Sequence, residues 1–264
     1  MTLCPHPTMP IAYAPQGLIG LLTPQANTTV EPEAWALLPS GISLINGRLV
    51  SAAPDLMQRL RDYFGDLAPT LIQFANAPLS VLALACTGSS YLMGRPAEQA
   101  WVEAWSQRLG IPVVTAGMAV VQALQQLGAQ RLALASPYPS DLTQSSVAYW
   151  QSHGFEVQLV QNVATSSQGF HAIYTTGAGA AAQTVQALRG SGADAVLMLG
   201  TGMPSLQAII EMGQGDGPPV LSSMLALMWR ATSLVQPQHQ NMDPWLSGDG
   251  WSHRAQAMGL LSTR

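Results

Sequence analysis

The sequence predicts an α/β protein made of two similar lobes, each a parallel sheet flanked by helices, with a ligand cleft between them. Three observations favour this fold. Short apolar runs alternate with longer amphipathic stretches along the chain. The apolar runs are rich in Val, Leu and Ala without alternating polar residues, as in strands that are covered on both faces. Segments of the first half also recur, in the same order, in the second half.

The elements follow from these runs in chain order. The strands are expected at Gly17–Leu22, Ile42–Ile45, Val81–Ala85, Val113–Thr115, Arg131–Ala135, Glu156–Val160, Ala195–Leu199 and Val220–Ser222. Amphipathic stretches between them predict helices, among them Ala97–Leu109, Gly117–Leu127, Leu142–Ser152 and Ala178–Arg189.

The internal repeat sets the division into lobes. Residues 17–24 resemble 131–137, residues 81–88 resemble 195–202, and residues 111–115 resemble 218–222. Three matches in one order indicate a duplication, so the ends of equivalent strands should line a shared cleft.

We expect the first lobe to comprise residues 15–116 together with a C-terminal segment from about 225 to 264. The second lobe would comprise residues 117–224, and residues 1–14 would form an irregular N-terminal arm.

Composition excludes several classes of function. Charged residues make up 9% of the 264, against roughly a quarter in ordinary domains, and all ten basic residues are Arg. Without Lys, the chain can form no lysine Schiff base and has no P-loop lysine. A net charge of −4 without a basic stripe argues against nucleic acid as a partner.

The apolar runs are too short to cross a membrane, and residues 1–10 do not resemble a signal peptide. Two Cys form no disulfide framework, so we expect a reduced, cytoplasmic protein. Association into a homo-oligomer, which would bury part of a surface poor in charge, is left open.

Cys86 is the main candidate for chemistry. It follows an apolar strand and precedes the turn Thr87, Gly88, Ser89, which can begin a helix. A helix N-terminus lowers a thiol pKa, and its N–H groups can hold a carboxylate or an enolate oxygen. The alternative from local context is a buried, inert thiol.

The remaining candidates give no metal site. Cys4 lies in the expected arm, and the histidines have no metal-ligand spacing; they are His6, His153, His171, His239 and His253.

Residues 20–33, read as Gly-Leu-Leu-Thr-Pro-Gln-Ala-Asn-Thr-Thr-Val-Glu-Pro-Glu, resemble the opening motif of maleate cis-trans isomerases. These enzymes belong to the cofactor-independent aspartate/glutamate racemase superfamily, with arylmalonate decarboxylase and hydantoin racemase. Looser similarities include the Cys86 turn, residues 136–138 with Asp141, residues 154–157 and residues 203–206. The resemblance implies two pseudo-symmetric α/β lobes, no cofactor, and a small carboxylic acid as substrate.

Site roles follow from the same resemblance. Cys86 matches the nucleophile, Asn27 would bind a substrate carboxylate, and Tyr138 and Asn162 would help to hold the carboxylates. Thr87, Gly88 and Ser89 would supply oxyanion donors. The second turn, formed by Gly200, Thr201 and Gly202, would contribute from the other lobe.

Gly200 departs from the family pattern, because isomerases and racemases place a second Cys there. Two-base racemisation needs an acid and a base on opposite faces of a carbon, so the change argues against a racemase. Arylmalonate decarboxylase, by resemblance, keeps the second Cys and has Gly in the first lobe, which is the reverse of this chain.

Three hypotheses remain. In the first, the Cys86 thiolate adds to a small unsaturated diacid, the bond rotates and the thiolate leaves. In the second, a substituted malonate loses CO₂ and Cys86 protonates the enediolate. The third is a ligand-binding module that has lost turnover.

Overall fold

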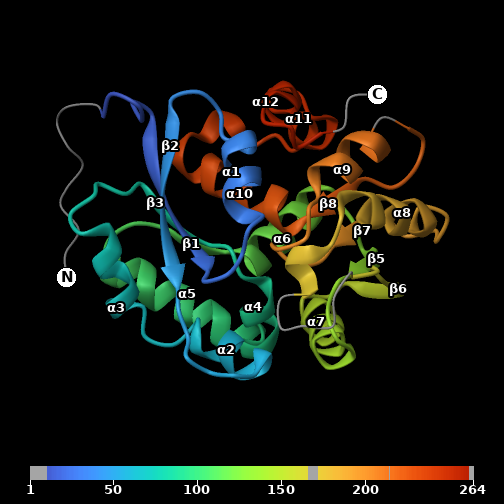
Figure 1. The fold of residues 1–264 in the computed structure, drawn as a ribbon, viewed down its shortest axis with the longest axis horizontal. Coiled ribbons are helices and arrows are strands. Elements are labelled where there is room, and N and C mark those ends of the chain that lie inside the picture. Colours follow the sequence, from blue (N-terminus) through green and yellow to red (C-terminus); the bar gives the residue numbers. More distant parts are fainter. Residues whose placement is uncertain (1–10, 166–171, 214, 262–264) are drawn as a thin grey trace.

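The computed structural model describes residues 11–165, 172–213 and 215–261, and it contains two parallel four-stranded sheets (Figure 1). The first sheet has the order β2-β1-β3-β4 and the second the order β6-β5-β7-β8. The strands are β1 (Gly17–Pro24), β2 (Ile42–Leu49), β3 (Val81–Leu84), β4 (Val113–Thr115), β5 (Arg131–Ser136), β6 (Glu156–Asn162), β7 (Ala195–Met198) and β8 (Val220–Ser222). The identical order of equivalent strands confirms the predicted two-lobe α/β fold.

Two strands at the sheet edges run further than their apolar runs indicated. The ladder between β1 and β2 continues through Arg48 to Leu49, although Ile42–Ile45 was the predicted strand. Similarly, β6 reaches Asn162 beside β5. Edge strands tolerate polar residues because one of their sides faces solvent, so hydropathy alone placed these ends too early.

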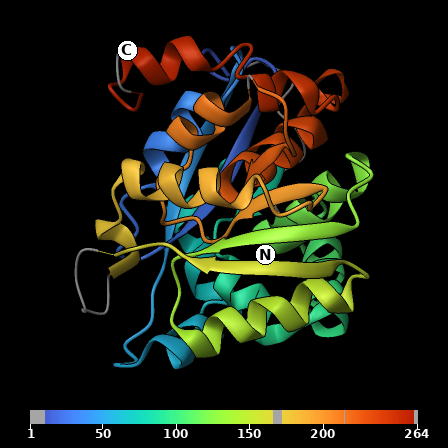
Figure 2. The same cartoon turned by 90° about the vertical axis from the view of Figure 1, so that its right-hand side faces the viewer.

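Helices cover both faces of the sheets, and Figure 2 shows α7 and α8 on opposite sides of the second sheet. The α-helices are α1 (Val30–Leu37), α2 (Leu56–Asp62), α3 (Ala68–Leu71), α4 (Thr87–Met93), α5 (Arg95–Leu109), α6 (Ala116–Gln126), α7 (Ser140–Ser152), α8 (Ala178–Leu188), α9 (Leu206–Gly213), α10 (Ser223–Val235), α11 (Asp243–Ser247) and α12 (Ser252–Ala257). Short 3₁₀ helices are η1 (Ile72–Phe74), η2 (Ala172–Thr175) and η3 (Pro237–His239). The four helices predicted from amphipathic stretches are confirmed, each within two residues at either end.

The last strand of each lobe passes into a helix through the same local device. The Thr115 hydroxyl accepts a hydrogen bond from the Met118 N–H at 3.2 Å and caps α6. The Ser222 hydroxyl accepts from the Leu225 N–H at 3.0 Å and caps α10. A hydroxyl cap satisfies a backbone donor that the first turn leaves unpaired. The repeat between the lobes therefore includes the hydroxyl side chain that caps the helix after the last strand.

Helix α10 returns from the second sheet to the first. It packs against α6 and α1 and against the strands β1, β3 and β4. This packing supports our proposal that the segment from about residue 225 returns to the first lobe, as does the contact of α12 with α1, whereas α11 packs against α9 of the second lobe. Most of the expected N-terminal arm lies outside the described residues, as do Cys4, His6 and His171.

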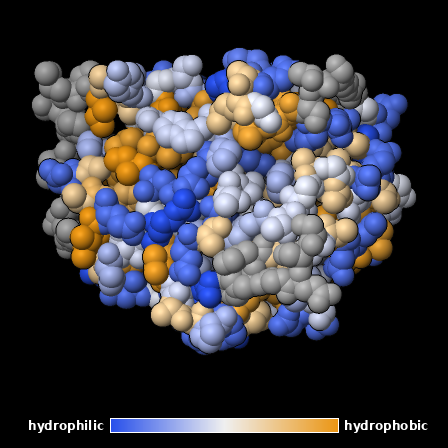
Figure 3. Space-filling model, in the orientation of Figure 1, coloured by the Kyte–Doolittle hydropathy of each residue, from blue (hydrophilic) through white to orange (hydrophobic). Residues whose placement is uncertain are grey.

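The apolar core forms one continuous cluster that includes strands of both sheets. On the face drawn in Figure 3, hydrophilic and hydrophobic residues are interspersed. Among the described helices, none combines the length and the hydropathy that crossing a membrane requires.

Candidate active site

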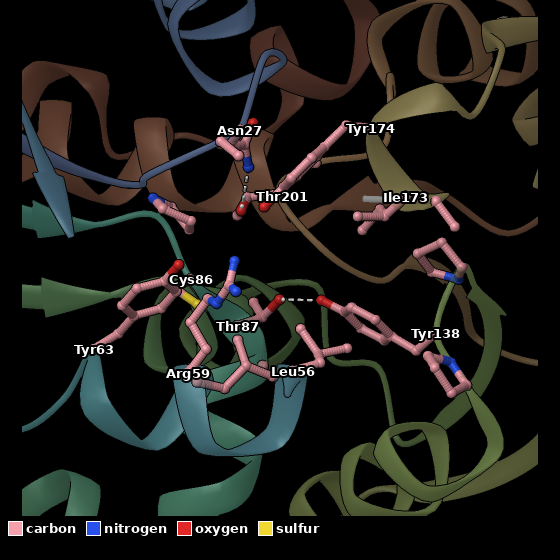
Figure 4. A pocket seen from close by; sticks show the side chains of 18 residues that line it. Asn27, Leu56, Arg59, Tyr63, Cys86, Thr87, Tyr138, Ile173, Tyr174 and Thr201 are labelled. Atoms are coloured by element: carbon pink, nitrogen blue, oxygen red, sulfur yellow. Dashed lines mark hydrogen bonds between the residues drawn. The ribbon is translucent and has the colours of Figure 1, made fainter. Parts of the chain in front are cut away.

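The candidate site is a cavity of about 320 Å³ between the lobes, at the carboxyl ends of the strands (Figure 4). The turns after β1 and β3 line it from the first lobe, and those after β5 and β7 line it from the second. Helix α2 and the short helix η2 complete the wall. The cavity therefore lies where the internal repeat predicted a cleft.

Cys86 lies in this wall with 4% of its surface exposed, at the N-cap of α4. Its sulfur is 3.1 Å from the Ser89 hydroxyl oxygen. That hydroxyl donates its hydrogen to the Leu60 carbonyl at 2.7 Å, so the Cys86 S–H is the donor to Ser89. Ser89 thus supports the thiol from behind and does not line the cavity itself.

The expectation of a lowered thiol pKa is wrong. Burial raises the pKa of Cys86, and the hydrogen bond with the Ser89 side chain and those with the Ser89 and Gly88 backbone oppose the rise without reversing it. The loss of water around a thiolate is the largest effect, and it outweighs the hydrogen bonds of the first turn of α4.

Asn27 presents a hydrogen-bond donor to the cavity. Its side-chain oxygen accepts from the backbone N–H groups of Thr29 and Val30, at 2.9 and 3.1 Å. These two bonds fix the amide orientation and turn Nδ2 towards Thr201, whose Oγ1 is 3.4 Å away. Thr201 in turn donates to the Ala85 carbonyl at 2.7 Å, across the lobes. The capping role and a donor role are therefore compatible in Asn27.

Thr87 and Tyr138 meet across the cleft, with their hydroxyl oxygens 3.1 Å apart (Figure 4). The Tyr138 ring lies edge-on to the Tyr91 ring, with centroids 6.2 Å apart. Burial raises the pKa of Tyr138 well above its ordinary value, so its hydroxyl is neutral and can donate.

The residues of the second turn, 200–202, differ in their position relative to the cavity. Thr201 and Gly202 line the cavity, and the Gly202 carbonyl accepts from the Thr29 hydroxyl at 2.9 Å. Gly200 lies behind Tyr138 in the left-handed region, with φ of +84°.

Asn162 is not brought to the cavity. It is exposed at the end of β6, where it borders a separate surface hollow with α7 residues such as Ser140 and Gln144. Because β6 is the outer strand of its sheet, its end lies away from the facing lobe. The predicted carboxylate contact of Asn162 therefore has no support in this geometry.

Helix α2 supplies a cavity wall that the sequence analysis missed. Leu56, Arg59, Leu60 and Tyr63 line the cavity from it, and Arg59 is the charged side chain among the described lining residues. The guanidinium donates to the Ala53 carbonyl through Nε and Nη2, at 3.2 and 2.8 Å. Arg59, Leu60 and Tyr63 follow Leu56 at spacings of three, four and seven residues, after the Asp55 cap. This spacing was the signal that these side chains share one helix face.

Tyr174, on η2, is a second missed residue, and Figure 4 shows its ring beside Asn27 and Thr201. Burial raises the pKa of Tyr174, and the nearby Arg59 charge opposes this rise. Among the described residues, no group of three or more His, Cys, Asp or Glu could hold a metal ion.

A family model described as arylmalonate decarboxylase matches residues 19–243. The chain belongs to the arylmalonate decarboxylase family. This confirms the superfamily resemblance drawn from residues 20–33.

Relatives of this family member fall into two enzyme types. The maleate isomerase of Geobacillus stearothermophilus is 26% identical over 234 residues, which cover 80% of this chain and 89% of that protein. The arylmalonate decarboxylase of Bordetella bronchiseptica is 27% identical over 228 residues, covering 82% and 90%. A solved structure of a Nocardia farcinica maleate cis-trans isomerase variant, with a covalently bound succinylcysteine intermediate, has the same fold. Its TM-score is 0.72 at 23% identity, with 83% of this chain and 92% of that chain covered.

Proposed function

We propose that this chain is a cofactor-independent isomerase that converts a small cis-unsaturated dicarboxylic acid, such as maleate, into its trans isomer. One observation carries the proposal. The cavity places the Cys86 sulfur together with two separate anion-binding groups, the Asn27 amide and the Arg59 guanidinium. In Figure 4 the Arg59 guanidinium reaches in beside Cys86 and Thr87, and the Asn27 amide lies apart from it, next to Thr201. A substrate with one carboxylate at each end of a short double bond fits this arrangement.

Arg59 also weighs against decarboxylation. Loss of CO₂ requires a carboxylate to shed its charge, and a cation nearby stabilises the charged ground state more than the departing CO₂. A guanidinium can instead hold a carboxylate through two parallel N–H bonds throughout a reaction that leaves both carboxylates intact. Arg59 is therefore suited to anchor the second carboxylate, whereas the sequence analysis expected Tyr138 and Asn162 to help to hold the carboxylates.

The proposed reaction uses groups of this chain alone. The Cys86 sulfur adds to one carbon of the double bond, and the electron pair moves to the other carbon. Thr87 and Gly88 line the cavity beside Cys86 and would face the carboxylate oxygen that takes up the negative charge. Rotation about the new single bond and loss of the sulfur then give the trans acid. In its solved structure the Nocardia relative carries a succinylcysteine, the type of adduct that this route would form.

Decarboxylation of a substituted malonate is the second candidate, and one observation favours it. Burial keeps Cys86 as a neutral thiol, and a proton donor acts in that state. We further propose a cytoplasmic location, since Cys86 would act as a reduced thiol.

The test is to incubate the protein with maleate and with phenylmalonate in D₂O and to follow both by NMR. Fumarate supports the proposal, whereas deuterated phenylacetate selects the decarboxylase. We expect Cys86→Ala to abolish turnover, and Cys4→Ala, the other cysteine of the sequence, to serve as the matched control that retains it. Binding of maleate without turnover would instead identify a ligand-binding module.

The pH profile separates the two roles of Cys86. A nucleophile must ionise, so kcat/KM for maleate should rise about tenfold per pH unit below the raised pKa of the thiol. A thiol acting as proton donor would give a flat profile that falls above that pKa. A flat profile between pH 6 and 8 would therefore contradict the nucleophile assignment.

A further inference from the structure

Cys86 and Gly200 occupy equivalent positions in the two lobes. Each lies two residues after the third strand of its lobe, since β3 ends at Leu84 and β7 ends at Met198. These strands hold the same place in the two sheets. The duplicated scaffold thus offers two places for a reactive group, and only the first holds a thiol.

The space at the second place is filled by Tyr138. A Cβ built on Gly200 would lie 2.8 Å from the Tyr138 hydroxyl oxygen, 3.1 Å from its Cζ and 2.9 Å from Ile173 Cδ1. Real Cβ atoms do not approach other atoms below 3.0 Å without displacing them. The positive φ of Gly200 disfavours a side chain as well. A second cysteine therefore does not fit here, and an O–H group stands where it would begin.

The Tyr138 hydroxyl is held in place and faces substrate space. It lines the cavity, bonds Thr87 across the lobes at 3.1 Å, and is fixed by the edge-on contact of its ring with Tyr91. Thr87 directly follows Cys86, so this contact brings the phenol to the turn that carries the sulfur.

We propose that Tyr138 takes the place of the second thiol and exchanges a proton with the carbon next to the one that Cys86 attacks. The inference rests on the proposed isomerase function and completes it. As the S–C bond forms from the Cys86 thiolate, the π electron pair takes the phenolic proton and a C–H bond forms. After rotation, the phenolate removes a proton from that carbon, the double bond re-forms, and the C–S bond breaks to release thiolate.

Neighbouring groups fit this cycle. Because burial keeps the Tyr138 phenol protonated, a proton is present at the start of the cycle. After the transfer, the Thr87 hydroxyl can donate to the phenolate oxygen and stabilise it. Because burial raises the pKa of Cys86, the thiol must first lose its proton to solvent. Once the thiolate has formed, the protons balance between Tyr138 and the substrate alone.

The experiment compares Tyr138→Phe with wild type on maleate. We expect kcat to fall at least about 100-fold with KM changed less than about threefold, since a positioned acid contributes in this range. The wild-type solvent isotope effect on kcat should be absent in the variant. A raised KM with kcat retained would show a carboxylate-holding role alone and would overturn the inference.

Tyr174→Phe is the matched comparison from the same cavity wall. A collapse of kcat in that variant, with Tyr138→Phe active, would assign the proton to Tyr174 and refute the proposal. If Tyr138→Phe does not fold, replacing Tyr138 with a fluorinated tyrosine keeps the ring and hydroxyl and lowers the phenol pKa. A kcat that does not respond to this change would refute the proposal equally.

Failure of the proposed isomerase function would give a different experimental result from failure of the proposed role of Tyr138. Wild-type protein that leaves maleate unchanged, or a Cys86→Ala variant that remains active, would contradict the isomerase proposal itself. Activity that depends on Cys86 but not on Tyr138 would contradict only the role of Tyr138.

Discussion

Arg59 is the charged side chain among the described residues that line the cavity, and the sequence analysis did not select it. The turns that bear Asn27, Cys86, Thr87, Gly88, Tyr138, Thr201 and Gly202 were predicted to reach the cleft, and these residues all line the cavity. They follow strand ends, which the fold brings together. Spacing could show that Arg59 and Tyr63 share a helix face, but tertiary contacts decide that this face, and Tyr174, pack over the cleft.

At this scale we predict that Arg59→Gln raises KM for maleate about 10- to 100-fold. Hydrogen bonds to a charged group contribute about 1.5–3 kcal/mol, and each 1.4 kcal/mol changes affinity tenfold. Arg61→Gln is the matched control, because Arg61 lies exposed on the same helix. Steady-state kinetics give KM for maleate in wild type and in both variants. Equal KM values for Arg59→Gln and wild type would remove the second anion site from the proposal.

At the scale of elements, the sequence predicted the eight strands because apolar runs without polar alternation are hard to confuse with loops. Their ends were less predictable, since β2 and β6 continue through polar residues at the sheet edges. The position of Asn162 away from the cavity also depends on a sheet edge. A motif match assigned it a role, but the strand that carries it lies at the outer edge of its sheet.

One contact joins α1 of the first lobe to the start of α9 in the second. The buried Glu33 carboxylate accepts hydrogen bonds from the Ser205 N–H at 2.5 Å and from the Ser205 hydroxyl at 2.8 Å. Burial raises the pKa of Glu33 to about 7, and the bonds from Ser205 and Leu206 oppose this rise. The connection between the lobes is therefore sensitive to pH.

The direction in which Glu33 makes folding stability depend on pH follows from proton uptake. Between the ordinary carboxyl pKa and about 7, folded Glu33 holds a proton that the unfolded chain has lost, so this residue makes stability fall as pH rises. The slope is about 1.4 kcal/mol per unit at most. We expect Glu33→Gln to remove this part of the decline in chemical denaturation between pH 5 and 8.

The stability profile of Glu33→Gln has to be compared with that of wild type, because the pKa of His153 is shifted in the opposite direction. Burial lowers the pKa of His153 to about 4, which makes stability rise with pH up to its ordinary value. Glu103→Gln, at an exposed site on α5, is the control that should keep the wild-type profile. Parallel profiles for wild type and Glu33→Gln would contradict the assignment.

On the scale of the whole molecule, the lobes are interlocked. Helix α10 leaves the second sheet and packs on the first, and the apolar core is continuous across both. The sequence predicted this return of the segment from about residue 225 to the first lobe, but it could not show which strands and helices α10 covers. We therefore expect one cooperative unfolding transition.

Leu225→Ala tests this expectation at a fully buried position of α10. Removing a buried Leu side chain typically lowers stability by about 2–5 kcal/mol. In differential scanning calorimetry we expect the single transition to move as a whole, with calorimetric and van't Hoff enthalpies in agreement. Two transitions, of which only one moves, would show that the lobes unfold independently.

The sulfur of Cys86 reaches the cavity from one lobe, while its counterpart position holds Gly200. Maleate is flat and symmetric, and on either of its faces the two alkene carbons are related by a mirror plane. Held between Asn27 and Arg59, it would meet sulfur from one face and at one of these carbons. The adduct would then form with a single configuration at the sulfur-bearing stereocentre. A scaffold that is nearly two-fold symmetric would thus act as a chiral template, because the duplication left a thiol in only one half.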